Sequence, residues 1–207
     1  MDNFLDGLKI LNINSINHYI VGLFAVRYYL EGHLPDEMPE GEDIDIVIAQ
    51  QDSSRILDLF SGREFEKVTT EKGEIITKFY PESLGKLVEF TLFNDFRVNE
   101  IKIDFGLRPE ILKLTKKIKI TSLTTKIASL DLLIAQKLVM FRGEGVYNPC
   151  DKRDLYLLIK NKKCQKDIGE TLNKVLPVVI ERNNKTKQTE LKSLLTQRYH
   201  LIKSQVV

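Results

Sequence analysis

The sequence predicts an α/β or α+β protein in which a mixed sheet with flanking helices precedes a C-terminal helical bundle. Two observations favour this fold class. In the middle of the 207-residue chain, polar and apolar side chains alternate over short segments that turn residues separate, as in strands. From residue 129 onward, apolar residues recur at helical spacing. We therefore expect two domains, with the sheet in residues 1–127 and the bundle in residues 128–207.

The first third of the chain mixes helical and extended patterns. The elements that we expect there are a partly helical segment (4–18), a helix (23–31), a loop (33–42), a strand (43–49) and a helix (53–60). Gly32 can end the helix 23–31 in a left-handed conformation, and Ser53 can cap the start of the helix 53–60. The loop contains two prolines, a glycine and four acidic residues, a composition that disfavours regular structure.

The rest of the chain passes from strands to helices. The expected elements are strands at 65–70, 74–80, 86–93 and 99–105, helices at 129–142 and 151–160, and a loop at 143–149 between these helices. Turn residues at 72–73 and 81–85 separate the strands, and Asp151 is placed to cap the second helix. Apolar residues at 168–179 and 191–202 continue the helical spacing.

Composition is that of a globular protein, with 43% hydrophobic and 29% charged residues. No apolar run reaches the ~18 residues of a membrane span, and the N-terminus lacks the basic start and apolar stretch of a secretion signal. Cys150 and Cys164 lack the companions of a metal site and are expected to be free thiols in a reducing compartment. We therefore expect a cytoplasmic protein that has no membrane partner.

Charge is unevenly distributed, although the net charge is only +2. Residues 1–136 carry 16 basic and 22 acidic side chains, whereas residues 137–207 carry 15 basic and 7 acidic side chains. An acidic first part and a basic second part fit metal-dependent chemistry beside a polyanion-binding surface. A lysine-rich helical face that is simply solvated explains the same counts, and both interpretations stay open.

The strand 43–49 carries the strongest chemical signal. Side chains alternate along a strand, so Asp43 and Asp45 point to one face while the isoleucines between and after them point to the other. Each of two neighbouring carboxylates raises the cost of ionising the other. A divalent cation removes that repulsion, and oxygen ligands suit a hard ion such as Mg²⁺.

Lys137 lies in the most apolar helix of the chain, and apolar residues surround it in sequence. A lysine in this position must either extend to water or meet an anion. Both interpretations of Lys137 stay open.

The order of these features resembles the nucleotidyltransferase superfamily related to DNA polymerase β. The shared pattern is a glycine before a helix (Gly22), Asp-x-Asp on a strand (Asp43 and Asp45), and a later strand with one aspartate (Asp104). Within that superfamily the chain is most similar to the AbiEii-type family, also called DUF1814, whose members occur as toxins of toxin–antitoxin and phage-defence systems. Matching segments are Ala128-Ser129-Leu130-Asp131-Leu132-Leu133-Ile134-Ala135-Gln136-Lys137-Leu138 and Lys152-Arg153-Asp154-Leu155-Tyr156-Leu157-Leu158.

The resemblance implies a nucleotidyltransferase-like sheet that binds Mg²⁺ or Mn²⁺ and a nucleoside triphosphate (NTP). The residues that it implies as metal ligands and catalytic residues are Asp43, Asp45 and Asp104. The residues that it implies near the nucleotide are Gly22, Leu23, Lys137, Arg153 and Asp154. It also implies transfer of a nucleoside monophosphate to an acceptor hydroxyl, expected on RNA, and a cognate antitoxin as a partner.

Other functions fit parts of the same pattern. Leu23 stands where the superfamily has a second glycine or a serine, and Leu158 where the family has a second aspartate. A catalytically inactive module of the same fold that binds nucleotide or nucleic acid is therefore an alternative. A glycosyltransferase would also use Asp-x-Asp to hold a nucleotide-sugar through a metal, but the single-aspartate strand and the short chain argue against it. The sequence does not distinguish among RNA, protein and small-molecule acceptors.

Overall fold

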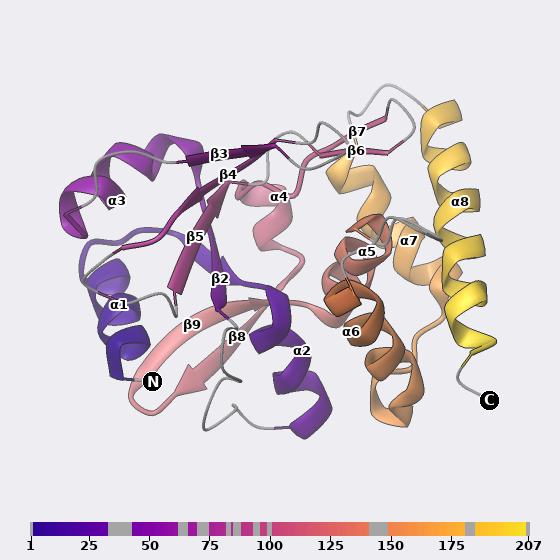
Figure 1. Cartoon of the computed structure of the whole chain (residues 1–207), viewed down its shortest axis with the longest axis horizontal. Helices are drawn as coiled ribbons and strands as arrows, with labels where there is room; N and C mark the ends of the chain where they lie inside the picture. The colour runs from indigo at the N-terminus through magenta and orange to yellow at the C-terminus, as the bar shows by residue number, and fades with distance from the viewer. Residues whose placement is uncertain are drawn as a thin grey trace.

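The computed structural model describes residues 2–32, 43–61, 66–69, 75–81, 84, 88–92, 96–98, 101–140, 149–180 and 185–205. Within these residues the chain forms a seven-stranded mixed sheet and a separate two-stranded sheet. Helices occur in both the first and the second half of the sequence. The predicted class, a mixed α/β fold followed by helices, is thus confirmed (Figure 1).

The helices agree with the main sequence predictions. The α-helices are α1 (Asp2–Ile13), α2 (Gly22–Glu31), α3 (Ser53–Leu59), α4 (Pro109–Leu112), α5 (Leu130–Met140), α6 (Pro149–Lys160), α7 (Ile168–Val179) and α8 (Lys185–Lys203). Short 3₁₀ turns occupy Gln50–Asp52 and Lys162–Cys164. Gly32 ends α2 with a left-handed backbone, as predicted. The second of the late helices begins at Pro149, so Asp151 lies inside α6 and does not cap it.

The large sheet is built from seven strands. They are β1 (His18–Ile20), β2 (Ile44–Ile48), β3 (Glu66–Thr69), β4 (Ile75–Phe79), β5 (Val88–Leu92), β8 (Thr115–Ile120) and β9 (Leu123–Ala128). Their order is β3-β4-β5-β2-β1-β9-β8, with the β2–β5 and β1–β9 pairs parallel and the others antiparallel. Strands β6 (Phe96–Val98) and β7 (Ile101–Ile103) form a separate antiparallel pair, and Ile103 of β7 also makes an isolated antiparallel bridge with Ile180.

Packing separates two groups of helices. Helices α5 to α8 gather beyond one end of the sheet, on the opposite side of the molecule from α1 and α3 (Figure 1). Helix α5 is buried along almost its whole length, which explains why its sequence is apolar on nearly every side. The division into two domains at residue 127 stays a prediction, because the buried residues form one continuous hydrophobic core.

Some elements were not predicted from the sequence. The β8–β9 hairpin, β6 and α4 fall in stretches for which the sequence pattern predicts no element. The predicted loop 33–42, most of the loop 143–149 and most of the turn residues between the middle strands lie outside the described residues. None of the described helices combines the length and hydropathy that crossing a bilayer requires.

Candidate metal centre

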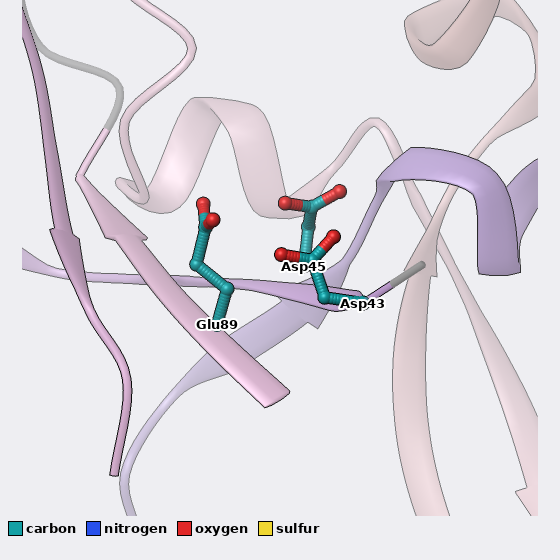
Figure 2. Close-up of side chains that lie close together, drawn as sticks. All are labelled: Asp43, Asp45 and Glu89. Atoms are coloured by element: carbon teal, nitrogen blue, oxygen red, sulfur yellow. The ribbon is translucent and has the colours of Figure 1, made fainter. Parts of the chain in front are cut away.

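Strand β2 places its two aspartates as the alternation predicts. Ile44, Ile46 and Ile48 are at most 1% exposed and form part of the core, whereas Asp45 is only half-buried on the opposite face. Asp43, immediately before the strand, is half-buried as well. The two carboxylates therefore lie side by side at the start of a strand in the middle of the sheet (Figure 2).

A third carboxylate joins them from the neighbouring strand. Strand β5 runs parallel to β2 in a register that places Glu89 directly beside Asp45. One oxygen atom of each of Asp43, Asp45 and Glu89 lies within 4.8 Å of the others. Figure 2 shows the three side chains on the same side of the two strands. We call these three residues the carboxylate cluster.

Glu89 was not predicted as a site residue, although the strand that carries it was predicted. The signal was one glutamate in a segment whose other residues are mostly apolar, Val88-Glu89-Phe90-Thr91-Leu92. All five residues are buried, so a charge among them requires partners. The missing information was the parallel pairing of β5 with β2, which brings residues 44 positions apart into contact and leaves no local sequence pattern.

Glu89 is held by three neighbours on the sheet. Lys78 Nζ on β4 lies 2.6 Å from Glu89 Oε2, and the Thr91 hydroxyl donates to Glu89 Oε1 at 2.6 Å. The Tyr80 hydroxyl donates to the same Oε2 atom and lies 3.3 Å from Asp43 Oδ2. Since Glu89 is only 1% exposed, these contacts replace the water that its carboxylate loses.

The electrostatics of the carboxylate cluster favour a bound cation. Burial first, then the charges of Glu89 and Asp43, raise the pKa of Asp45 well above its ordinary value. Burial and the charge of Glu89 also raise the pKa of Asp43. Burial acts to raise the pKa of Glu89 too, but the Lys78 ammonium and the hydrogen bonds to the carboxylate lower it on balance. The positive charges of Lys78 and Lys137 only partly offset the repulsion at Asp45.

The backbone of Gly22 lies directly against the Asp45 carboxylate. It begins α2 with a positive φ of 65°, and a Cβ atom added there would lie 1.8 Å from Asp45 Oδ2. The backbone N–H of Val21 donates to the Asp45 carbonyl at 3.0 Å, which fixes the start of the helix against β2. The carboxylate thus lies where free N–H groups and the helix dipole favour negative charge. Leu23, the next residue of α2, is half-buried.

Lys137 is buried and meets an anion of the protein itself. Its ammonium lies 2.8 Å from Asp154 Oδ2, and the side chains of the two residues are 9% and 2% exposed. Arg153 adds a second contact to Asp154 at 3.2 Å from a side chain that is 47% exposed. The positive charge of Lys137 offsets a small part of the rise in the pKa of Asp45, so it reaches the carboxylate cluster. Leu158, on the same helix as Asp154, is fully buried in the core.

Asp104 lies elsewhere. It follows β7, which belongs to the two-stranded sheet, and Arg108 Nη1 pairs with its carboxylate at 2.5 Å. The Gly106 N–H donates to the other oxygen at 2.7 Å, and the Asp104 N–H donates to the Val179 carbonyl at 2.8 Å. The resemblance implied Asp104 as the third metal ligand, but among the described residues the carboxylate that joins Asp43 and Asp45 is that of Glu89.

The donor set of the carboxylate cluster fits a divalent cation. Two oxygens bound to one ion at roughly 2.1–2.4 Å lie at most about 4.8 Å apart, which is the span of this cluster. All the donors are carboxylate oxygens, the ligand type that Mg²⁺ and Mn²⁺ accept. Burial and the neighbouring carboxylate charges raise the pKa values of Asp43 and Asp45, and the positive charge of such an ion would offset both effects.

Comparison with known proteins gives weak likenesses to solved structures. No protein family matches the sequence, and no curated protein matches it. The solution structure of the antibiotic-resistance factor ANT(2'')-Ia is similar with a TM-score of 0.42 and 12% identity, over 98% of this chain and 88% of that one. The crystal structure of an antigenic nucleotidyltransferase-like protein from Paracoccidioides brasiliensis is similar with a TM-score of 0.42 and 19% identity, over 94% and 89% of the two chains.

Proposed function

We propose that the chain is a metal-dependent nucleotidyltransferase that moves a nucleoside monophosphate from an NTP to an acceptor hydroxyl. The observation that carries this proposal is the carboxylate cluster of Asp43, Asp45 and Glu89, on two adjacent parallel strands. The helix start at Gly22 beside it supports the proposal, because a helix N-terminus favours a phosphate group. The order of Gly22, Asp43 and Asp45 along the chain, which resembles the superfamily pattern, also supports it.

Different residues would bind the metal and the triphosphate in such a transfer. Asp43, Asp45 and Glu89 would hold Mg²⁺ or Mn²⁺, and divalent ions there supply charge stabilisation for the attacking and leaving oxygens. The backbone at Gly22 and Leu23 would bind the triphosphate, and Lys137 would add positive charge nearby. The acceptor oxygen would bond to the α-phosphorus as the bond from that phosphorus to the β-phosphate oxygen breaks. Pyrophosphate leaves, and the hydroxyl proton passes to solvent.

Binding tests the metal site. Isothermal titration of the wild type with Mg²⁺ and each NTP should give saturable heat. The double variant Asp43→Asn, Asp45→Asn and the single variant Glu89→Gln should lose most of it while staying folded. Asp104→Asn is the matched control, since that carboxylate pairs with Arg108 away from the cluster and should leave binding unchanged. Equal binding by the wild type and the double variant would remove the metal-site assignment.

The finer proposal concerns the acceptor and the biology. We infer from the resemblance to AbiEii-type proteins that the acceptor is RNA and that the chain is a toxin with a cognate antitoxin. Incubation with each labelled NTP, Mg²⁺ or Mn²⁺ and total RNA, followed by a gel, should show label on RNA. Induced expression in a bacterial host should slow growth, and Asp45→Asn should relieve it at equal protein level. Harmless expression without labelled RNA would contradict both inferences.

A second candidate is an inactive module of the same fold that binds a single ion or nucleotide. The observation that favours it is Lys78, whose ammonium already lies 2.6 Å from Glu89 and neutralises part of the carboxylate cluster. Lys78→Met should tighten Mg²⁺ binding if the ammonium competes with the ion. A metal titration that saturates at one ion, with no dependence on triphosphate and no transfer, would favour this module over the enzyme.

A further inference from the structure

A polar pocket lies at the β1-β9-β8 side of the large sheet, whereas Glu89 of the carboxylate cluster lies on β5, on the other side of β2. The pocket has a volume of about 100 Å³ and is formed beyond the end of α1, beside β1 and the β8–β9 hairpin. The polar side chains that matter here are Asn12, Asn17, His18, Thr125, Lys117 and Lys126. No acidic side chain is among its described lining residues. We call it the lysine pocket.

The two lysines stand directly opposite each other. Lys117 on β8 and Lys126 on β9 are paired across the antiparallel hairpin. Like charges in that position destabilise a sheet. Lysine on an edge strand such as β8 is a common protection against aggregation. Lys126 has no such role, because β9 lies between β1 and β8.

Neither lysine is neutralised within the described part of the chain. Lys126 Nζ donates to Asn17 Oδ1 at 3.4 Å, and Lys117 has no hydrogen bond or ion pair with a described residue. Lys116, the neighbour of Lys117, differs: it lies over the Tyr28 ring and 3.2 Å from its hydroxyl. Tyr28 of α2 therefore provides a partner for Lys116, whereas the pair that lines the pocket has only the neutral Asn17 side chain as a partner among the described residues.

The wall of the lysine pocket is already ordered. The His18 ring is 5% exposed, with Nδ1 2.9 Å from the Ile16 carbonyl and Nε2 2.9 Å from Thr125 Oγ1. A carbonyl only accepts, so Nδ1 carries the proton and Nε2 accepts from the threonine hydroxyl. The Asn12 amide donates to the Thr124 carbonyl at 3.1 Å and ties α1 to the hairpin. An anion would thus enter a fixed recess whose charge is supplied by two ammonium groups.

We propose that the lysine pocket binds a phosphoryl group. Two ammonium groups match the charge of a phosphoryl oxyanion, for which lysine is a common partner. The volume of about 100 Å³ is several times what one water needs. The phosphoryl group has two sources, a free phosphate or pyrophosphate and the backbone of a nucleic acid. Nothing in the proposal depends on the carboxylate cluster.

Isothermal titration of the full chain tests the proposal. Inorganic phosphate, pyrophosphate and a short single-stranded oligonucleotide are titrated separately, at constant ionic strength, with EDTA and without NTP. Without divalent ions the carboxylate cluster repels all three probes, so its own function does not affect the result. We expect saturable binding of at least one probe by the wild type, and binding at least about tenfold weaker in Lys117→Met, Lys126→Met. Binding of the free anions identifies the first source, and binding of the oligonucleotide alone identifies the second.

Two further variants separate a site from general positive charge. Lys119→Met is the matched control, because Lys119 lies on the same strand, opposite Thr124, and does not line the pocket. It should bind like the wild type. Lys117→Glu replaces the like-charged pair by an ion pair with Lys126, so it should fold and yet bind no phosphate. Absence of saturable binding by the wild type, or equal loss in Lys119→Met and the double variant, would overturn the proposal.

Discussion

The carboxylate cluster and the lysine pocket are built in the same way and compensated differently. Strand register pairs Asp45 with Glu89 in one and Lys117 with Lys126 in the other, so like charges stand side by side in both. Glu89 is buried, and the protein surrounds it with an ammonium and two hydroxyls. Lys117 is exposed, and water solvates its charge. Burial therefore decides how much compensation a like-charged pair needs, and substitutions near the cluster should have the larger effects.

The largest effect should come from Gly22→Ala. The added Cβ would lie 1.8 Å from Asp45 Oδ2, and the positive φ strains any residue with a side chain. We expect about 4 kcal/mol of lost stability, from backbone strain together with a forced displacement of Asp45. Thermal and urea unfolding measure it. The control is Gly32→Ala, which has φ of 78° but nothing within 4 Å of the new atom, and should cost only about 1 kcal/mol. Equal losses would mean that Asp45 adapts freely.

Lys137→Met should cost about 2–3 kcal/mol, because it leaves the Asp154 carboxylate, 2% exposed, without its buried partner. Arg153→Met removes the other partner of the same carboxylate from an exposed position and should cost under about 1 kcal/mol. Neutralising both charges, in Lys137→Met, Asp154→Asn, should recover part of the loss. Chemical denaturation of the four proteins measures the difference. If Lys137 also contacts the triphosphate, NTP binding should stay weak in the double variant even where stability returns.

The pH dependence of the free energy of unfolding should show the cost of ionising the carboxylate cluster. Because the folded-state pKa of Asp45 is raised, its contribution is fully present below its unfolded pKa of about 3.9 and is lost as pH rises through the folded pKa. Asp43 acts in the same direction, and Glu89, with its lowered pKa, in the opposite one. In EDTA, Asp45→Asn should therefore gain stability relative to the wild type as pH rises above about 4. Saturating Mg²⁺ should shrink that difference. Parallel wild-type and variant curves would contradict the raised pKa.

Features that depend on a few successive residues could be predicted from the sequence. The alternation of side chains predicted the two faces of β2, and Gly32 predicted the end of α2. Glu89 and Asp104 both lie in predicted strands. Their different surroundings depend on which strand pairs with which. That pairing is set by long-range packing and leaves no local signal.

The β8–β9 hairpin was missed for a related reason. In Thr115-Lys116-Lys117-Ile118-Lys119-Ile120 the alternation of polar and apolar residues is short, and the many lysines make the segment look like a polar loop. The two-residue turn, Thr121-Ser122, lacks glycine and asparagine, although Thr121 adopts a positive φ of 51° that these residues favour. The lysine pocket follows from this hairpin, so the sequence could not indicate it.

The smallest effect, and the sharpest test of the comparison, is Lys117→Glu. It converts a like-charged cross-strand pair into an opposite-charged one at an exposed position, and we expect a gain of about 0.5 kcal/mol. Lys119→Glu, opposite the neutral Thr124, makes the same charge change two residues away and should leave stability nearly unchanged. Urea unfolding at low and high salt measures both, and the gain should shrink with salt because exposed charges are screened. A gain well above 1 kcal/mol would mean that the lysine pair is as poorly solvated as the carboxylates. A gain equal in both variants would assign it to overall charge and not to the pair.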